Sequence, residues 1–301
     1  MSVHRPPATA VVTDSTSYIP VDLIGDLPIS VVPLHVVLGD RTGEEGSDIQ
    51  PAEVADALRR RGSRVSTSRP SPERFIKQYQ QLLRSGVHEI VSVHISSELS
   101  GTWDAARMAA EECNLAAGRK AVVVVDSRIV CMAMGYAVLA AARAAVAGAD
   151  AAQVEVVAQR MCDQSANFFY VDTLEFLRRG GRIGAAQALV GSALAVKPLL
   201  HLSEGRIVPL EKVRTASRAI SRLRELAVAQ SLRYEGNVAV AVQHLAAAER
   251  AEKLRQELSE KLPKVSRIDV AEVGAVVGAH VGPGLLAIAI SPDLDHGLSQ
   301  S

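Results

Sequence analysis

The sequence predicts an α/β protein of two domains, and three observations support this. Short apolar runs alternate with helical patterns through the first half, which is typical of βαβ units around a buried parallel sheet. The second half joins its apolar runs both by hairpin-like turns and by helices, which predicts a mixed, largely antiparallel sheet. The chain has 301 residues, enough for two ordinary domains.

The N-terminal domain, residues 8–165, is expected to be an α/β/α sandwich with a mainly parallel sheet. Its expected strands are the apolar runs TAVVT, SVVPLHVVL, EIVSVHI and AVVVV. Its expected helices are PAEVADALRRR, PERFIKQYQQLL, WDAARMAAEECN and MGYAVLAAARAAVA. These strands read as continuous apolar segments, so we expect helices on both faces of the sheet.

The C-terminal domain, residues 166–292, is expected to be a two-layer α/β domain, followed by a frayed tail over 293–301. FFYVDT reads as a strand, and residues 174–200 as a helix, a glycine turn and a second helix. Further on, the pattern predicts in turn SEGRIVPLEKVRT as a hairpin turn and strand, ASRAISRLRELAVAQ as a helix, NVAVAVQHL as a strand, AAAERAEKLRQELSEKL as a helix, and two closing apolar stretches. Helices are expected to cover one side of this sheet.

The composition and the sequence pattern give no reason to expect nucleic acid, a metal ion or a membrane as a partner. Lys plus Arg and Asp plus Glu both number 33, so the zero net charge gives no reason to expect nucleic acid or an anionic membrane as the main partner. Cys113, Cys131 and Cys162 lack metal-type spacing, so we expect buried thiols and no metal. No signal core and no run long enough to span a bilayer are visible, so we expect a cytoplasmic protein without a transmembrane segment.

Common cofactor and catalytic motifs are missing from the sequence. There is no phosphate-binding G-x-x-x-x-G-K-[ST] loop, no dinucleotide G-x-G-x-x-G fingerprint, no G-x-S-x-G elbow and no H-E-x-x-H. The sequence therefore gives no motif that would support the enzyme classes defined by these patterns, and we expect no cofactor.

Three expected strands end in small polar residues. These ends read Asp14-Ser15-Thr16, Ser96-Ser97 and Asp126-Ser127. The carboxyl ends of parallel strands border the ligand crevice, so such residues are placed to face a ligand. They equally suit the N-caps of the following helices, and both interpretations stay open.

The middle of these strand ends continues into a hydroxyl cluster, Ser96 to Thr102. Gly101 lets the backbone approach a ligand closely, and Ser100 and Thr102 stand where a helix should begin. A helix N-terminus favours anions. A serine nucleophile would need a base, for which His280 is a candidate.

Two glycine-rich stretches also call for an explanation. Gly180-Gly181, flanked by Arg178, Arg179 and Arg182, reads either as a helix C-cap or as a positive rim for a ligand or partner. The stretch GAHVGPG, residues 278–284, reads as a tight turn around His280. Several glycines close together usually mark a place where the backbone lies close to another group, because glycine has no side chain.

In this order, the motifs resemble those of the DegV family of bacterial fatty-acid-binding proteins. The matching stretches, which cover nearly the whole chain, are Asp14 to Thr16, Thr67 to Ser71, Ser96 to Thr102, Val125 to Ser127, Leu174 to Ile183, Lys197-Pro198, Lys212 to Arg214 and His280 to Gly284. Arg69 departs from the family's usual glutamine and adds a charge there, while Cys131, Ala133 and Ala287 depart where the acyl chain would lie.

The resemblance implies one long-chain fatty acid in an apolar tunnel, with its carboxylate near the interdomain cleft. The residues expected to hold the carboxylate are Thr67, Ser97, Ser100 and His280. The residues expected to support the cleft are Ser68, Ser96, Gly101, Thr102, Gly282, Pro283 and Gly284.

The resemblance also implies a carrier without catalytic residues of its own. Such a carrier presents its fatty acid to a separate fatty-acid kinase, which makes an acyl phosphate for phospholipid synthesis. Residues expected to contact this partner or its phosphate are Arg178, Arg179, Arg182 and Arg214. The alternative is a serine-dependent acyl hydrolase or acyltransferase using Ser97 or Ser100 with His280, against which the missing nucleophile elbow counts.

Overall fold

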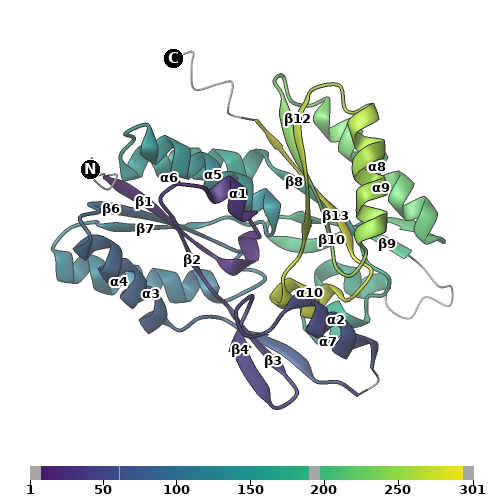
Figure 1. Ribbon diagram of the computed structural model, residues 1–301, viewed down its shortest axis with the longest axis horizontal. Helices are drawn as coiled ribbons and strands as arrows, with labels where there is room; N and C mark the ends of the chain where they lie inside the picture. The colour runs from purple at the N-terminus through teal and green to yellow at the C-terminus, as the bar shows by residue number, and fades with distance from the viewer. Residues whose placement is uncertain (1–7, 61, 190–196, 294–301) are drawn as a thin grey trace.

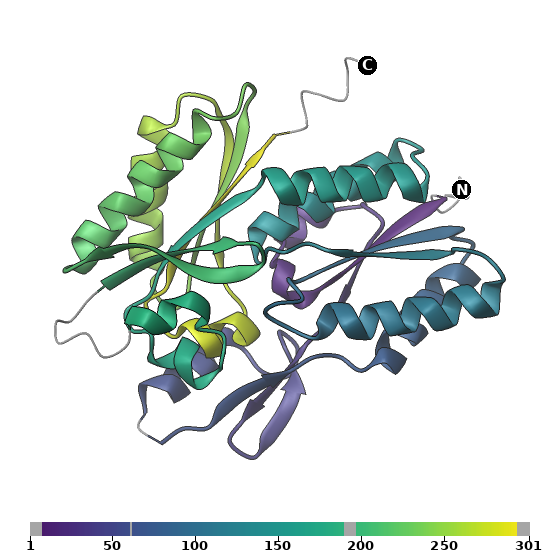
Figure 2. The same ribbon diagram turned by 180° about the vertical axis from the view of Figure 1, so that it is seen from behind.

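The computed structural model describes residues 8–60, 62–189 and 197–293 (Figures 1 and 2).

The first sheet of the protein is parallel throughout. The strand order is β2-β1-β6-β7, with bounds β1 (Thr9–Asp14), β2 (Ile29–Val32), β6 (Glu89–His94) and β7 (Val122–Asp126). A short 3-10 helix, η1 (Ser15–Ser17), and helix α1 (Val21–Ile24) connect β1 to β2.

Helices cover both faces of this sheet, as the sequence predicts. The helices are α3 (Pro72–Arg84) and α4 (Thr102–Ala117) on one face, and α5 (Met132–Val146) and α6 (Ala151–Gln164) on the other. Neighbouring strand residues point to opposite faces. Ala10 and Ile90 accordingly pack with the α3–α4 side, whereas Val11 and Val91 pack with the α5–α6 side.

The second sheet is mixed and mostly antiparallel, as predicted. Its order is β10-β9-β8-β13-β11-β12, and of these neighbours only β11 and β12 run parallel. The bounds are β8 (Ala166–Tyr170), β9 (Lys197–Ser203), β10 (Arg206–Val213), β11 (Val238–His244), β12 (Val265–Glu272) and β13 (Leu286–Pro292). Helices α8 (Ala216–Ser231) and α9 (Ala248–Lys261) cover one face, and the other face turns toward the N-terminal part of the chain.

A small third sheet was not expected from the sequence. Its strands, in the order β4-β3-β5, are β3 (His35–Leu38), β4 (Arg41–Glu44) and β5 (Val65–Ser68). Residues 30–38 had the pattern of one run, but Pro33 separates β2 from β3, which join different sheets. The third sheet and helix α2 (Pro51–Arg59) pack on α10 (Ala275–Val281), a helix near the other end of the chain.

Two expectations for the C-terminal part were wrong. The second helix expected up to residue 200 is instead the 3-10 helix η2 (Gly184–Leu189) after α7 (Glu175–Arg179), and then strand β9; residues 190–196 lie outside the described range. An apolar run can form either element, and here pairing with both β8 and β10 makes residues 197–203 a strand. The expected turn over 278–284 begins as helix, because α10 continues to Val281.

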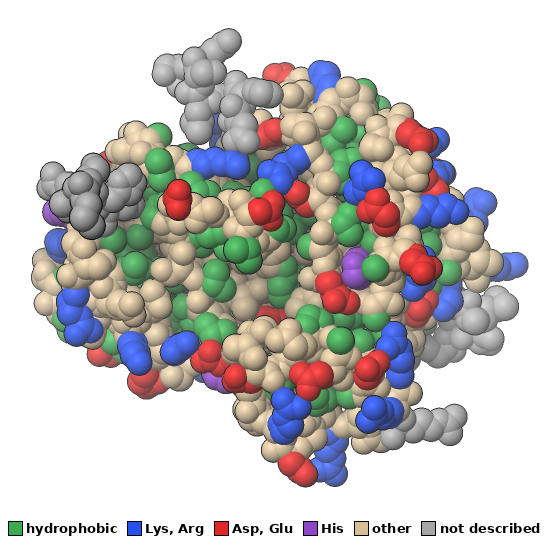
Figure 3. Space-filling model, viewed as in Figure 1, with side chains coloured by type: hydrophobic (Ala, Val, Ile, Leu, Met, Phe, Trp, Pro, Cys, Tyr) green, Lys and Arg blue, Asp and Glu red, His purple; other side chains and the backbone are tan. Residues whose placement is uncertain are grey.

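The surface carries charges of both signs. Figure 3 shows Lys, Arg, Asp and Glu side chains interspersed over α9, in keeping with a net charge of zero. Within the described ranges, no helix is both long and apolar enough to cross a bilayer. The expected frayed tail lies outside these ranges apart from residue 293.

A buried hydrogen-bonded chain links β1, β6 and α3. Asp14 Oδ2 lies 2.9 Å from His94 Nδ1 and accepts a 3.0 Å bond from the backbone N–H of Ile95. His94 Nε2 lies 2.7 Å from Ser92 Oγ, which in turn lies 2.8 Å from the Tyr79 hydroxyl. This is the atom order of a Ser-His-Asp triad, but Asp14, Ser92, His94 and Tyr79 are all 0% exposed. The chain therefore stabilises the end of the sheet and has no access to a substrate.

Replacing His94 with leucine should destabilise the protein by about 3 kcal/mol, because the buried Asp14 carboxylate loses a partner. Tyr79→Phe, which removes only the last hydroxyl, should cost about 1 kcal/mol. Urea unfolding of the two variants and the parent chain measures both costs. Equal losses would show that His94 does not compensate the buried carboxylate.

Candidate functional site

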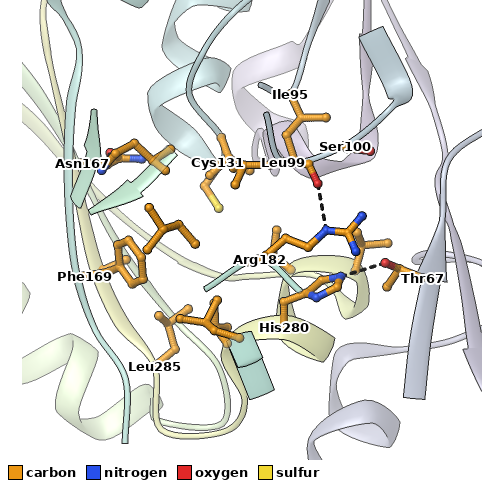
Figure 4. A pocket seen from close by; sticks show the side chains of 18 of the residues that line it. Thr67, Ile95, Leu99, Ser100, Cys131, Asn167, Phe169, Arg182, His280 and Leu285 are labelled. Atoms are coloured by element: carbon orange, nitrogen blue, oxygen red, sulfur yellow. Dashed lines mark hydrogen bonds between the residues drawn. The ribbon is translucent and has the colours of Figure 1, made fainter. Parts of the chain in front are cut away.

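A cavity of about 370 Å³ lies where the three sheets meet, within the size range of small-molecule pockets. Most of its lining is apolar, including Leu99, Phe169, Leu177, Leu202, Leu285 and Ile288. Polar groups gather at one end: Figure 4 shows Thr67, Ser100, Arg182 and His280 on the side opposite Asn167. No acidic side chain is found among the lining residues of the described chain.

A hydrogen bond between Thr67 and His280 forms part of the polar end. Thr67 Oγ1 lies 2.8 Å from His280 Nε2, although the two residues are 213 positions apart (Figure 4). Thr67 stands on β5, where its partner on β3 is Val36, and His280 stands on α10. The structure thus brings together two of the four residues predicted to hold a carboxylate.

The imidazole of His280 is neutral at physiological pH. Burial, with a smaller contribution from the positive charge of Arg182, lowers the pKa of His280 from 6.5 to about 4. Its Nδ1 is buried without a hydrogen-bond partner in the described chain, so a proton there would have no acceptor. With the proton on Nε2, His280 donates to Thr67, and the Thr67 hydroxyl can then donate to a ligand in the cavity.

The two glycine-rich stretches pack against each other. A Cβ on Gly180 would lie 2.1 Å from His280 Nδ1, so only glycine leaves room for the imidazole. Gly282, with φ of +76°, similarly faces the Phe176 ring, from which a Cβ would be 2.0 Å away. The close approach expected from the sequence is real, but it is to other protein groups. Gly282 is the C-cap of α10, and Gly282, Pro283 and Gly284 all lie outside the cavity lining.

Ser100 faces the cavity and Gly101 lies beside it. The Ser100 hydroxyl is 2.8 Å from the hydroxyl of Thr102, which is buried and begins α4. The N-cap position of α4 is Gly101, and the Ser100 hydroxyl accepts a hydrogen bond at 3.3 Å from the N–H of Thr102, the first residue of this helix. Ser68 also lines the cavity, whereas buried Ser96 donates to the Gly205 carbonyl.

Ser97 is turned away from this site. Its hydroxyl donates to Asp126 Oδ2 at 2.5 Å, and its backbone N–H donates to Asp126 Oδ1 at 3.1 Å. Ser97 is not part of the cavity lining, so this geometry gives the expected carboxylate contact at Ser97 no support. Because His280 bonds Thr67, neither Ser97 nor Ser100 is paired with it as a nucleophile would be.

Two arginines border the polar end. Arg182 lines the cavity, where its Nε donates to the Leu99 carbonyl at 3.0 Å and its Nη1 to the Gly180 carbonyl at 2.7 Å. Arg69 also lines the cavity and donates to the Gly101 carbonyl at 3.0 Å. The other predicted partner arginines lie on the surface outside the lining: Arg178 and Arg179, which pair with Glu175, and Arg214.

Sequence reasoning missed Glu45, which fixes the start of α10. This buried carboxylate accepts hydrogen bonds from the Ser15 hydroxyl, from the Tyr18 hydroxyl at 2.9 Å and from the Val276 N–H at 2.7 Å. Burial raises the pKa of Glu45, while these three donors oppose that shift. Gly274 leaves the space, because a Cβ there would lie 2.2 Å from Glu45 Oε1.

The family of the chain follows from comparison with known sequences. A family model described as "Uncharacterised protein, DegV family" matches residues 8–293. The chain belongs to the DegV family. A DegV domain-containing protein of Streptomyces coelicolor is 51% identical over 94% of this chain and 98% of its own length. One from Listeria innocua is 34% identical over the same shares of the two chains.

Solved DegV structures share the fold. A DegV family protein from Thermus thermophilus, described by its fatty acid binding, is 36% identical with a TM-score of 0.86, covering 95% of this chain and 100% of its own. DegV from Bacillus subtilis, described as a fatty acid binding protein, is 34% identical with a TM-score of 0.85, covering 96% and 100%. The α/β architecture read from the sequence is therefore that of the DegV family.

The lowered pKa of His280 predicts a specific pH dependence of stability. Unfolded chains take up a proton on this imidazole near pH 6.5, but the folded protein does so only near pH 4. Its contribution to stability is complete above the higher value and falls by about 3 kcal/mol as the pH drops through this window. The difference in unfolding free energy between the parent protein and His280→Gln, measured across this range, checks the prediction. A difference independent of pH would contradict it.

Proposed function

We propose that this DegV protein binds one long-chain fatty acid, with the acyl chain in the cavity and the carboxylate at Thr67, Ser100 and His280. One observation carries this proposal: an apolar cavity ends in hydroxyls and a neutral imidazole. The fatty acid binding described for the relatives from T. thermophilus and B. subtilis supports it.

The energetics of a fatty acid suit such a cavity. Each buried methylene contributes about 0.8 kcal/mol, so the apolar lining supplies most of the affinity. The carboxylate must find donors, because an unpaired buried charge is costly. Thr67 and Ser100 provide hydroxyl donors, and the positive charge of Arg182 lies beside His280. The lining contains no carboxylate to repel the ligand within the described residues.

The proposed role is that of a carrier for a separate fatty-acid kinase, in the cytoplasm. Hydroxyl donors leave one carboxylate oxygen able to attack a phosphoryl donor bound to the partner. The kinase would supply the phosphoryl donor and the catalytic groups, and this chain would supply the oriented acid. Exposed Arg178, Arg179 and Arg214 are proposed to contact the partner or its phosphate.

Lipid analysis of the purified protein should return close to one long-chain fatty acid per chain. After delipidation, Thr67→Val and Ser100→Ala should each weaken fatty-acid binding about tenfold or more, because each removes a hydrogen bond to a charged group. Ser97→Ala is the matched control, since this hydroxyl bonds Asp126, and should bind nearly as the parent does. Unchanged affinity in the first two variants would refute the proposed carboxylate site.

Reversing charge at Arg178 and Arg179 together should reduce acyl-phosphate formation by a fatty-acid kinase with ATP, at unchanged fatty-acid affinity. Both side chains are exposed and lie outside the cavity, so the loss would report on the partner contact. Lys253→Glu together with Arg255→Glu on α9, where Arg255 pairs with Glu252, is the control that changes the net charge by the same amount. Equal activity of the Arg178 and Arg179 variant and this control would exclude the proposed surface.

A further inference from the structure

Two carboxamides interrupt the apolar wall that the six-stranded sheet presents to the cavity. On β11, Val238, Val240 and Val242 pack under α8 and α9, so Gln243 projects from the opposite face. Asn167 projects from β8, and both side chains line the cavity. Figure 4 shows Asn167 across the cavity from Thr67 and His280.

The orientation of both carboxamides is set by backbone N–H groups. Gln243 Oε1 accepts from the N–H of Met132 at 3.1 Å, and Asn167 Oδ1 accepts from the N–H of Leu202 at 3.3 Å. Each N–H requires an acceptor, so each amide turns its oxygen to the backbone. The NH₂ group of each carboxamide takes no part in these hydrogen bonds.

Neither NH₂ group finds a partner in the described chain. Gln243 is 1% exposed, and its Nε2 is buried without a hydrogen bond there. Asn167 is half-buried, and its nitrogen makes no hydrogen bond to the described residues. Ala287, the β13 partner of Gln243, and Phe169, the β8 partner of Ala287, are apolar. A water molecule needs several polar partners, so these neighbours offer it a poor site.

We infer, granted the proposed fatty-acid binding, that the preferred ligand carries an oxo or hydroxyl oxygen along its acyl chain, bound by Gln243 with help from Asn167. A saturated acyl chain would exclude water from this wall of the cavity and leave the amide donors without hydrogen-bond partners. This cost disfavours the binding of a saturated chain. Sites built to hydrogen-bond a ligand group discriminate strongly against the analogue that lacks it. An oxo group fits best, because its oxygen only accepts, whereas a hydroxyl brings a hydrogen that needs an acceptor of its own.

The test compares stearic acid with a positional series of oxostearic acids on the delipidated full-length protein. Isothermal titration measures each affinity. At one chain position the oxo acid should bind at least about tenfold more tightly than stearic acid. In Gln243→Met, which keeps the length of the side chain but lacks the amide, this ratio should fall to about one.

Two further variants make the result interpretable. Asn167→Leu should also lower the ratio, and it keeps the test available if Gln243→Met folds poorly after Met132 loses its acceptor. Ala287→Val, in the same row of the sheet, changes cavity size without removing a donor and should leave the ratio as in the parent.

Stearic acid that binds as tightly as every oxo acid would overturn this inference while leaving fatty-acid binding intact. A preference that survives in both Gln243→Met and Asn167→Leu would overturn it as well. If neither stearic acid nor any oxo acid binds, the proposed function itself fails, and the inference fails with it.

Discussion

The hydrogen bond between Thr67 and His280 is the interaction on which the geometry of the polar end depends. It joins β5 of the small third sheet to α10, and each of these elements supplies residues to the cavity wall. The fatty acid proposed as the ligand poses two opposing demands, since its chain must be buried while its carboxylate must not be left unpaired. A neutral imidazole that orients a neutral hydroxyl answers both, because the empty site then carries no charge of its own at these two residues.

Helix α10 is held in place by parts of the chain far from it in sequence. Glu45 binds its N-terminal turn, Gly180 makes room beside His280, and Phe176 packs against Gly282 after its last turn. The third sheet and α2, both from the first quarter of the chain, pack on the same helix. The domain boundary near residue 165 stays a prediction; α6 ends at Gln164 and β8 begins at Ala166, and residues on both sides of this point line the cavity.

The sequence predicted elements well where local pattern and tertiary context agree. The valine-rich strand β7 and the helices α3 and α5 are examples. Helix α6 was overlooked, although Asp150 and Gln153 form a capping box at its start that could have revealed it. Strand β9 was misread because an apolar run has no decisive period, and only its pairing with β8 and β10 makes it a strand.

The site was predictable only in part, for a similar reason. Motif order pointed to Thr67, Ser100 and His280, which the structure places at one cavity. No local signal could reveal that Glu45 caps a helix 231 residues away, or that Gly180 accommodates a specific imidazole. Such pairings depend on the packed structure, and sequence spacing does not encode them.

The polar strand ends divide into two groups according to charge. The Asp126 carboxylate accepts hydrogen bonds from the hydroxyl and the N–H of Ser97, and the Asp14 carboxylate accepts one from the N–H of Ile95. The acidic strand ends therefore hold the serine loop from the side away from the cavity. Ser100, the serine of this loop that lines the cavity, is paired with the hydroxyl of Thr102 and not with an acid. An anionic head group could not share a site with a carboxylate, because two like charges in a low-dielectric cavity repel each other. The arrangement therefore separates the serine that supports the loop from the serine proposed to contact the ligand, and this separation explains why Ser97 and Ser100, three residues apart, face different partners.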